Sequence, residues 1–158
     1  MILVSLFVIL ILAVSLLAGL KEGAVKHFFN LGAALIALPI AGQAYSLIAT
    51  LLSFLPGENW ENFLGFFISY ALILALLHLI FWAPQKLVQK KWKRGLLYRV
   101  LGGSLNVVDA SIGFVVFALV VFAYPIFDWL ERWVDGSSVL TFLIEIFDFV
   151  SVLLPGEF

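Results

Sequence analysis

The sequence predicts an all-α membrane protein with four transmembrane helices and a C-terminal amphipathic helix in the membrane interface. Of the 158 residues, 64% are hydrophobic and 12% are charged, whereas a soluble domain has roughly 45–50% apolar and about 25% charged residues. Four long apolar runs are separated by short polar connectors, and eight of the nine Lys and Arg residues fall in two of these connectors. A soluble core of this length could not cover so much apolar surface. We therefore expect one membrane domain over residues 1–158.

The first apolar run, residues 1–20, contains no charged side chain. At about 1.5 Å per residue it covers the roughly 30 Å hydrocarbon core of a bilayer. No Lys or Arg precedes the run, and it is longer than the apolar part of a secretory signal. We expect a transmembrane helix here.

The second run, residues 28–54, is longer than one perpendicular crossing and is expected to tilt, kink or extend beyond the hydrocarbon. Pro39 is the expected kink, because proline removes a backbone donor and crowds the preceding turn. Ala33, Ala37 and Ala41 lie four residues apart and form a stripe of small side chains. Such stripes let helices approach closely in lipid.

The third run, residues 63–82, ends at Trp82, which suits an interfacial anchor. Pro84 is expected to stop this helix. The fourth run, residues 100–124, contains Asp109, the only carboxylate within a predicted span. Without Asp109 the remaining stretch would be too short to cross, so the predicted helix includes it.

The tail predicts an amphipathic helix over residues 139–153, with Ser137 or Ser138 as its N-cap. Apolar side chains recur on one face, and polar side chains share the opposite stripe, namely Thr141, Glu145 and Asp148. The segment is too short and too charged to cross a bilayer. We expect it to lie in the interface or against the bundle.

Charge asymmetry predicts the orientation. Cytoplasmic loops retain Lys and Arg, and the two basic connectors hold Lys21, Lys26, Lys86, Lys90, Lys91, Lys93, Arg94 and Arg99. Four crossings place both connectors on one side and the mostly acidic segments on the other. The prediction is a multi-pass membrane protein with both termini outside the cytoplasm.

The second basic connector also predicts contact with anionic lipid head groups, at about 1 kcal/mol per basic residue. The residues expected to make it are Lys86, Lys90, Lys91, Lys93 and Arg94. Docking of a cytosolic partner or of nucleic acid is the alternative. Topology and lipid attraction explain the charges without either, so no nucleic-acid partner is expected.

Asp109 is the leading candidate for a functional side chain, because a carboxylate in hydrocarbon must be paired, hydrated or protonated. At helical spacing Gly102, Asn106, Asp109 and Gly113 share one face, which is expected to pack against other helices. The functional interpretation is a proton, ion or solute contact. The structural one is an interhelical hydrogen bond or a salt bridge. His78 is predicted to approach Asp109 if the third and fourth spans pack together.

Several chemistries are disfavoured. The chain has no Cys, which removes disulfides, thiolate metal sites and a Cys nucleophile. His27, expected at the interface, and His78 are too far apart in sequence to suggest a metal site. No P-loop, HExxH, GxSxG or GxGxxG pattern occurs. We expect neither an enzyme nor a cofactor.

Three segments carry a resemblance to a known family. They are the turn from Gly19 to Lys26, the segment from Arg99 to Gly102, and the tail from Ser138 to Pro155. In the turn, Gly23 is followed three residues later by Lys26, and the second segment has the pattern R-x-L-G. With these features the chain resembles the colicin V production protein family of small bacterial inner-membrane proteins.

The chain departs from the family pattern at three positions. Tyr98 stands where members often have Asp, and Asn106 and Asp109 stand in a region that commonly holds Gly or Arg. Polar contacts are therefore expected to replace part of the family's glycine packing.

The resemblance implies a non-enzymatic membrane component that supports toxin production and secretion or envelope homeostasis. We expect it to act on a membrane partner or a second copy through the small-residue faces of the second and fourth spans. One alternative is a small channel or transporter subunit that uses Asp109. Another is an intramembrane enzyme, for which His78 is the only nearby second group.

Overall fold

The computed structural model describes residues 2–54, 57–92 and 95–154, and all regular structure in these ranges is helical. Four helices are long: α1 Ile2–Glu22, α2 Ala24–Leu51, α3 Glu58–Lys91 and α4 Leu96–Ala123. Each is long and apolar enough to cross a membrane. The predicted all-α membrane fold with four crossing helices is confirmed.

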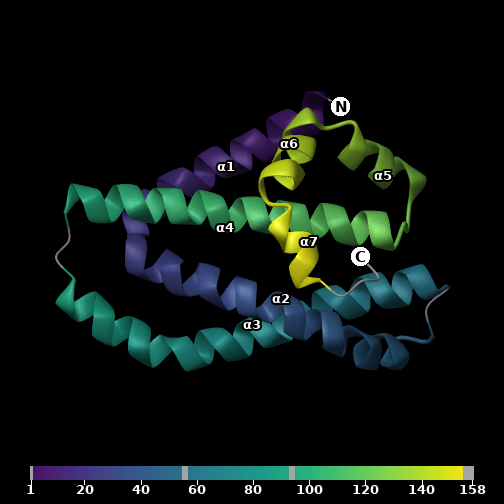
Figure 1. Ribbon diagram of the computed structural model, residues 1–158, viewed down its shortest axis with the longest axis horizontal. Helices are drawn as coiled ribbons and strands as arrows, with labels where there is room; N and C mark the ends of the chain where they lie inside the picture. Colours follow the sequence, from purple (N-terminus) through teal and green to yellow (C-terminus); the bar gives the residue numbers. More distant parts are fainter. Residues whose placement is uncertain (1, 55–56, 93–94, 155–158) are drawn as a thin grey trace.

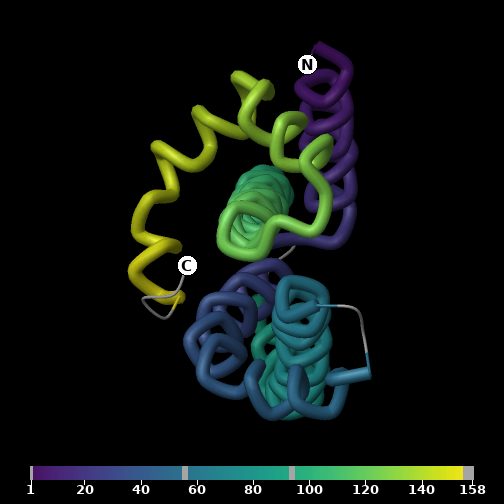
Figure 2. Tube along the Cα trace, turned by 90° about the vertical axis from the view of Figure 1, so that its right-hand side faces the viewer, coloured from purple at the N-terminus to yellow at the C-terminus, as the bar shows by residue number. Residues whose placement is uncertain are grey.

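Helix α4 lies at the centre of the molecule, with α1 on one side, the α2–α3 hairpin below it, and the tail curving around another side (Figure 2). α1 packs mainly on α4, while α2 packs on both α3 and α4. The main core draws on every long helix and on the tail, through Val8, Leu38, Phe66, Val116 and Val150.

The turn between α1 and α2 is a single residue, Gly23. Its φ of 88° lies in the left-handed region that glycine adopts without strain. Its backbone N–H donates to the Gly19 carbonyl at 2.9 Å, which ends α1. Because one residue suffices, α2 begins at Ala24, four residues before the apolar run that starts at residue 28.

Helix α3 corrects one prediction: Pro84 does not stop it, and the helix continues to Lys91. Proline removes only its own N–H, and later residues still bond back along the helix. Glu58 and Glu61 in the first turn and basic residues in the last turn suit the helix dipole. These charges help to explain why α3, which bows along its length in Figure 1, extends beyond the apolar run. Pro39 likewise lies inside α2 without ending it.

The tail forms three short helices: α5 Asp128–Asp135, α6 Ser138–Ile146 and α7 Phe149–Leu153. α5 lies in a segment for which only a connector was expected. The Ser137 hydroxyl caps α6 by accepting from the Leu140 N–H at 3.4 Å, and it lies 3.0 Å from the Ser5 hydroxyl of α1.

The single helix predicted over residues 139–153 is wrong, because the segment breaks between α6 and α7. Leu140, Leu143 and Val150 are buried, and Glu145 and Asp148 are exposed, but the apolar Ile146 is 54% exposed, so the predicted separation into an apolar and a polar face is not confirmed. A straight helix could not keep all of these apolar residues on the curved path that the tail follows around α4 (Figure 2). Its position in the membrane interface stays a prediction.

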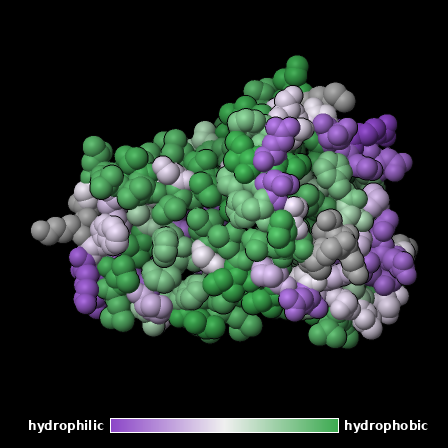
Figure 3. Space-filling view, viewed as in Figure 1, coloured by the Kyte–Doolittle hydropathy of each residue, from purple (hydrophilic) through white to green (hydrophobic). Residues whose placement is uncertain are grey.

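The surface is hydrophobic over much of the face in Figure 3, with hydrophilic residues gathered towards the two ends and along part of the tail. Large apolar side chains are more than two-thirds exposed in every long helix, among them Leu3, Leu47, Leu79 and Leu96. So large an apolar surface is typical of contact with lipid.

Candidate functional site

The tightest helix contact lies where α1 crosses α4. A Cβ placed on Gly19 would collide with the Gly102 carbonyl oxygen and come within 2.8 Å of the Asn106 Cβ. A Cβ on Gly102 would in turn lie 2.6 Å from the backbone of Gly23. The two backbones therefore touch directly, and Gly19 and Gly102 together form what we call the glycine junction.

Tyr98 covers the turn beside this junction. A Cβ on Gly23 would overlap the Tyr98 ring, which is buried against Ala24 and Val25. The positive φ at Gly23 and the aromatic cover therefore both require glycine. Tyr98, the departure from the family pattern, supplies packing that a shorter Asp side chain could not.

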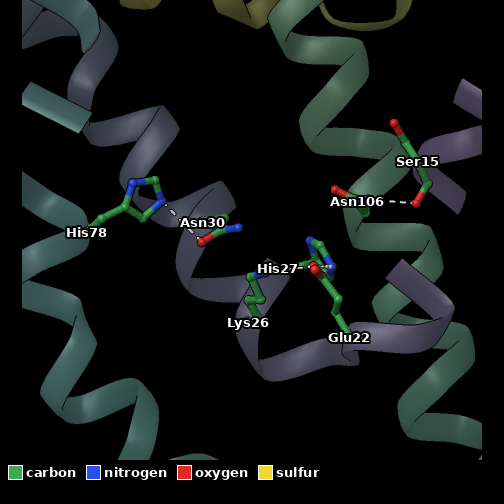
Figure 4. A network of polar contacts seen from close by, with 7 residues as sticks. All are labelled: Ser15, Glu22, Lys26, His27, Asn30, His78 and Asn106. Atoms are coloured by element: carbon green, nitrogen blue, oxygen red, sulfur yellow. Dashed lines mark hydrogen bonds and ion pairs between the residues drawn. The ribbon is translucent and has the colours of Figure 1, made fainter. Parts of the chain in front are cut away.

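One helical turn from the junction, Asn106 connects α4 to α1. Its side-chain amide donates to the Ser15 carbonyl at 2.6 Å (Figure 4). One amide N–H is thereby paired inside the bundle, which lowers the cost of a polar group in hydrocarbon surroundings. Asn106 thus acts here as an interhelical contact.

Lys26, a family-motif position, belongs to an ion cluster at the α1–α2 turn. Its Nζ lies 2.9 Å from Oε2 of Glu22, and Nε2 of His27 lies 3.1 Å from the same oxygen (Figure 4). His27 is 2% exposed, so its side chain packs inside the protein, and its expected place at the level of the membrane interface stays a prediction. The one-residue turn folds His27 back over Glu22, and neither residue was expected in a site. Their spacing of five residues could have suggested a contact only if the shortness of the turn were known.

Asp109 has different neighbours from Asn106. It is partly buried and lies close enough to His78 and Tyr70 of α3 to interact with them electrostatically. Among the described residues, no hydrogen bond or ion pair to its carboxyl group is found. Asn106 and Asp109 therefore face different neighbours and do not form one polar site.

His78 does approach Asp109, but its ring is shared with α2. Its Nε2 lies 3.1 Å from Oδ1 of Asn30 (Figure 4), and its side chain is exposed. The nitrogen that faces Asn30 is thus already engaged. Asn30 was not singled out as a partner, because the pairing of α2 with α3 had to be known first.

The small residues expected at helix contacts divide into two groups. Ala33, Ala37 and Ala41 are fully buried. Gly113 is exposed, and a Cβ there would meet nothing within 4 Å. The expected packing role of Gly113 is therefore absent within one copy.

The basic residues of the two connectors lie around the end of the bundle that holds the α1–α2 turn (Figure 1), whereas Arg132 lies in α5. Lys86 places its Nζ 3.8 Å from the ring centroid of Trp82, a cation–π contact. Lys90 and Lys91 end α3. Lys93 and Arg94, also expected to contact head groups, lie outside the described residues, as does Pro155 of the tail motif.

Arg99 and Lys21 line a polar recess of about 510 Å³ at the same end, between the C-terminus of α1 and the N-terminus of α4. Through Arg99 this recess connects to the family-motif positions, since Gly102 lies one turn further along α4. In the part of the chain that the structure describes, no group of three or more His, Asp or Glu side chains could hold a metal ion.

Comparison with known proteins identifies one family. A family model described as colicin V production protein matches residues 4–148. Neither the search of curated proteins nor the search of solved structures gave a match. The matched region contains both sides of the glycine junction, the ion cluster and Asp109.

Proposed function

The chain belongs to the colicin V production protein family, and from that membership we propose that it supports the production or export of a colicin V-like peptide toxin, or the envelope homeostasis that accompanies it. It does so as a non-enzymatic membrane component. The family is not one of known enzymes.

The glycine junction is the observation that carries this proposal. The motif positions Gly19, Gly23 and Gly102 come from distant parts of the sequence and meet in one backbone contact. Lys26 is held nearby by Glu22. The glycines hold α1 and α4 in direct backbone contact. A role as a scaffold for a membrane partner or a second copy follows from that chemistry.

A toxin-secreting strain that lacks its own family member tests the role. We expect the wild-type chain to restore secreted toxin activity and Gly19→Leu to fail, because leucine cannot fit against Gly102. Gly32→Leu is the matched control, since a Cβ at Gly32 meets nothing within 4 Å. Membrane abundance of each variant is measured by immunoblot. Undiminished toxin secretion without any family member would contradict the proposal.

The proposed location is the bacterial inner membrane with both termini outside. The two basic connectors lie at the same end of the bundle and the acidic helix α5 lies towards the other (Figure 1), which supports this orientation. Because the chain has no Cys, single cysteines at Lys90 and Asp128 can be labelled with an impermeant maleimide on intact spheroplasts. Labelling at Asp128 alone is expected, and labelling at Lys90 alone would reverse the orientation.

A second candidate function, a small channel or transporter subunit, is favoured by the unpartnered Asp109 carboxyl group. His78 and Tyr70 stand beside it and could exchange protons or hold a solute. Proton flux into liposomes containing the wild type is expected to exceed that of Asp109→Asn. Flux at the level of empty liposomes from both proteins would eliminate this candidate.

A further inference from the structure

The polar recess at the basic end of the bundle has the shape and charge of an anion site. It is lined by residues from the end of α1 and the start of α4: Lys21, Glu22, Gly95, Leu96, Tyr98 and Arg99. Its volume of about 510 Å³ is ample for a phosphate group and its substituents. It lies beside the glycine junction, which fixes the distance between its two walls.

The two cations of the recess are not neutralised. Neither Lys21 nor Arg99 has an ion-pair partner among the described residues. Glu22, the one carboxylate in the lining, is engaged by Lys26 at 2.9 Å and by His27 at 3.1 Å. The charge available to a ligand is therefore positive, and a guanidinium is well suited to phosphate oxygens.

The backbone adds to this preference. α4 starts after Gly95, which makes no side-chain capping hydrogen bond. The first N–H groups of a helix have no partner within the helix and carry a partial positive charge. Two of these N–H groups are those of Leu96 and Tyr98, and both residues line the recess.

An apolar cleft of about 360 Å³ is lined in part by Ala24 and Val25, against which Tyr98 of the recess is buried. Residues from the start of α2, the end of α3 and the start of α4 line it: Ala24, Val25, Phe28, Phe29, Val88, Trp92, Leu101 and Leu105. Tyr98 stands between the two spaces. It lines the recess and is buried against Ala24 and Val25. The centroid of its ring lies 6.3 Å from the centroid of the Trp92 ring, which lines the cleft. A positively charged recess next to an apolar cleft suits a ligand that has a negatively charged group and an apolar chain.

We propose that this recess binds the phosphate group of an anionic phospholipid, with an acyl chain in the adjoining cleft. Lys21 and Arg99 hold the phosphate oxygens, and the open start of α4 completes the site. The proposal requires only that this end of the bundle meets a lipid leaflet, so it stands independently of the toxin-related function and of the orientation.

Native mass spectrometry of the purified protein in neutral detergent, titrated with phosphatidylglycerol, tests the site. We expect Lys21→Gln/Arg99→Gln to bind this lipid about tenfold more weakly or worse, because charge-assisted hydrogen bonds are lost. Lys90→Gln/Lys91→Gln removes the same charge at the same end, outside the recess. Neutral detergent provides no anionic bilayer surface to which Lys90 and Lys91 could be attracted. The affinity of this control variant for phosphatidylglycerol should therefore change less than about twofold. Equal losses from both double variants would overturn the proposal.

Gly95→Asp provides a test that does not depend on a destabilised protein. A Cβ at Gly95 meets nothing within 4 Å, its φ of −130° is extended, and Asp is a favoured N-cap. The variant should fold at least as stably as the wild type, yet lose phosphatidylglycerol binding about tenfold, because its carboxylate occupies the start of α4 and repels the phosphate. Wild-type lipid binding by this variant would also overturn the proposal.

Competition with glycerol 3-phosphate distinguishes lipid from soluble phosphate as the source. The cleft predicts that the soluble compound, at equal concentration, leaves phosphatidylglycerol bound, since it lacks an acyl chain. Displacement of the lipid at equal concentration would contradict the assignment to a phospholipid and identify a site for free phosphate esters.

Discussion

Two neighbouring segments along one face of α4 differ sharply in their contacts. In the first segment, Gly102 touches α1 through the backbone and Asn106 donates to Ser15 at 2.6 Å. In the second segment, Asp109 lies near His78 and Tyr70 of α3, which packs closely on α2 but approaches α4 at few places, such as Phe67 against Phe117. The comparison teaches that polar groups on one helix can serve as structure in one segment and remain available in the next. Three substitutions test this contrast, from the largest expected effect to the smallest.

Gly102→Ala is expected to have the largest effect. The new methyl group would lie within 3 Å of the backbone of Gly19 and Gly23 and force α1 away from α4. We expect the free energy of unfolding to fall by about 2–3 kcal/mol, measured by circular dichroism during denaturation in detergent. Gly32→Ala, where the added Cβ meets open space, should be neutral or stabilise by up to about 1 kcal/mol. Equal losses in the two variants would mean that the junction is not a close contact.

Asn106→Ala is expected to have an intermediate effect in the same segment of α4. It removes one interhelical hydrogen bond, and such bonds contribute about 0.6 kcal/mol on average and up to about 1.7 kcal/mol. We expect a loss of about 1 kcal/mol in the same unfolding measurement. Ser104→Ala is the control, because that exposed hydroxyl bonds only to the Val100 carbonyl of its own helix. An unchanged stability for Asn106→Ala would show that the bond to Ser15 is dispensable.

Asp109→Asn should have the smallest effect on stability. No hydrogen bond or ion pair of the described residues is lost, and a formal charge leaves the bundle. We expect a change within about 0.5 kcal/mol, towards greater stability. A loss as large as that of Asn106→Ala would reveal a structural partner for the carboxyl group and would remove the contrast between the two segments of α4.

Hydropathy was sufficient to predict the four crossing helices, because burial in lipid depends on the total apolar length of each run. The ends of the helices were less predictable. α3 continues through Pro84 to Lys91, since a helix can extend past the hydrocarbon wherever its charges and backbone bonds allow. The break in the tail depends on the curved path around α4, which no local pattern records.

The candidate site was predictable as a set of residues but not as a set of contacts. Gly19 and Gly102 were expected from motif positions, yet the contact between them depends on α1 pairing with α4. Asn106 and Asp109 share a helix face in projection. Their different neighbours follow from the placement of α1 and α3 around α4, and sequence periodicity carries no information about that placement.

The pairing of α1 with α4 has a consequence for how the protein is made. α2 and α3 follow one another along the chain, so their hairpin can assemble in the bilayer as soon as both leave the ribosome. α1 is synthesised first, yet its main partner emerges last among the four crossing helices. Until α4 inserts, the backbone at Gly19 is exposed to lipid, because Gly102 is not yet present to pack against it. A nascent chain that stops before α4 therefore presents an unfinished surface to the membrane and its quality-control proteases.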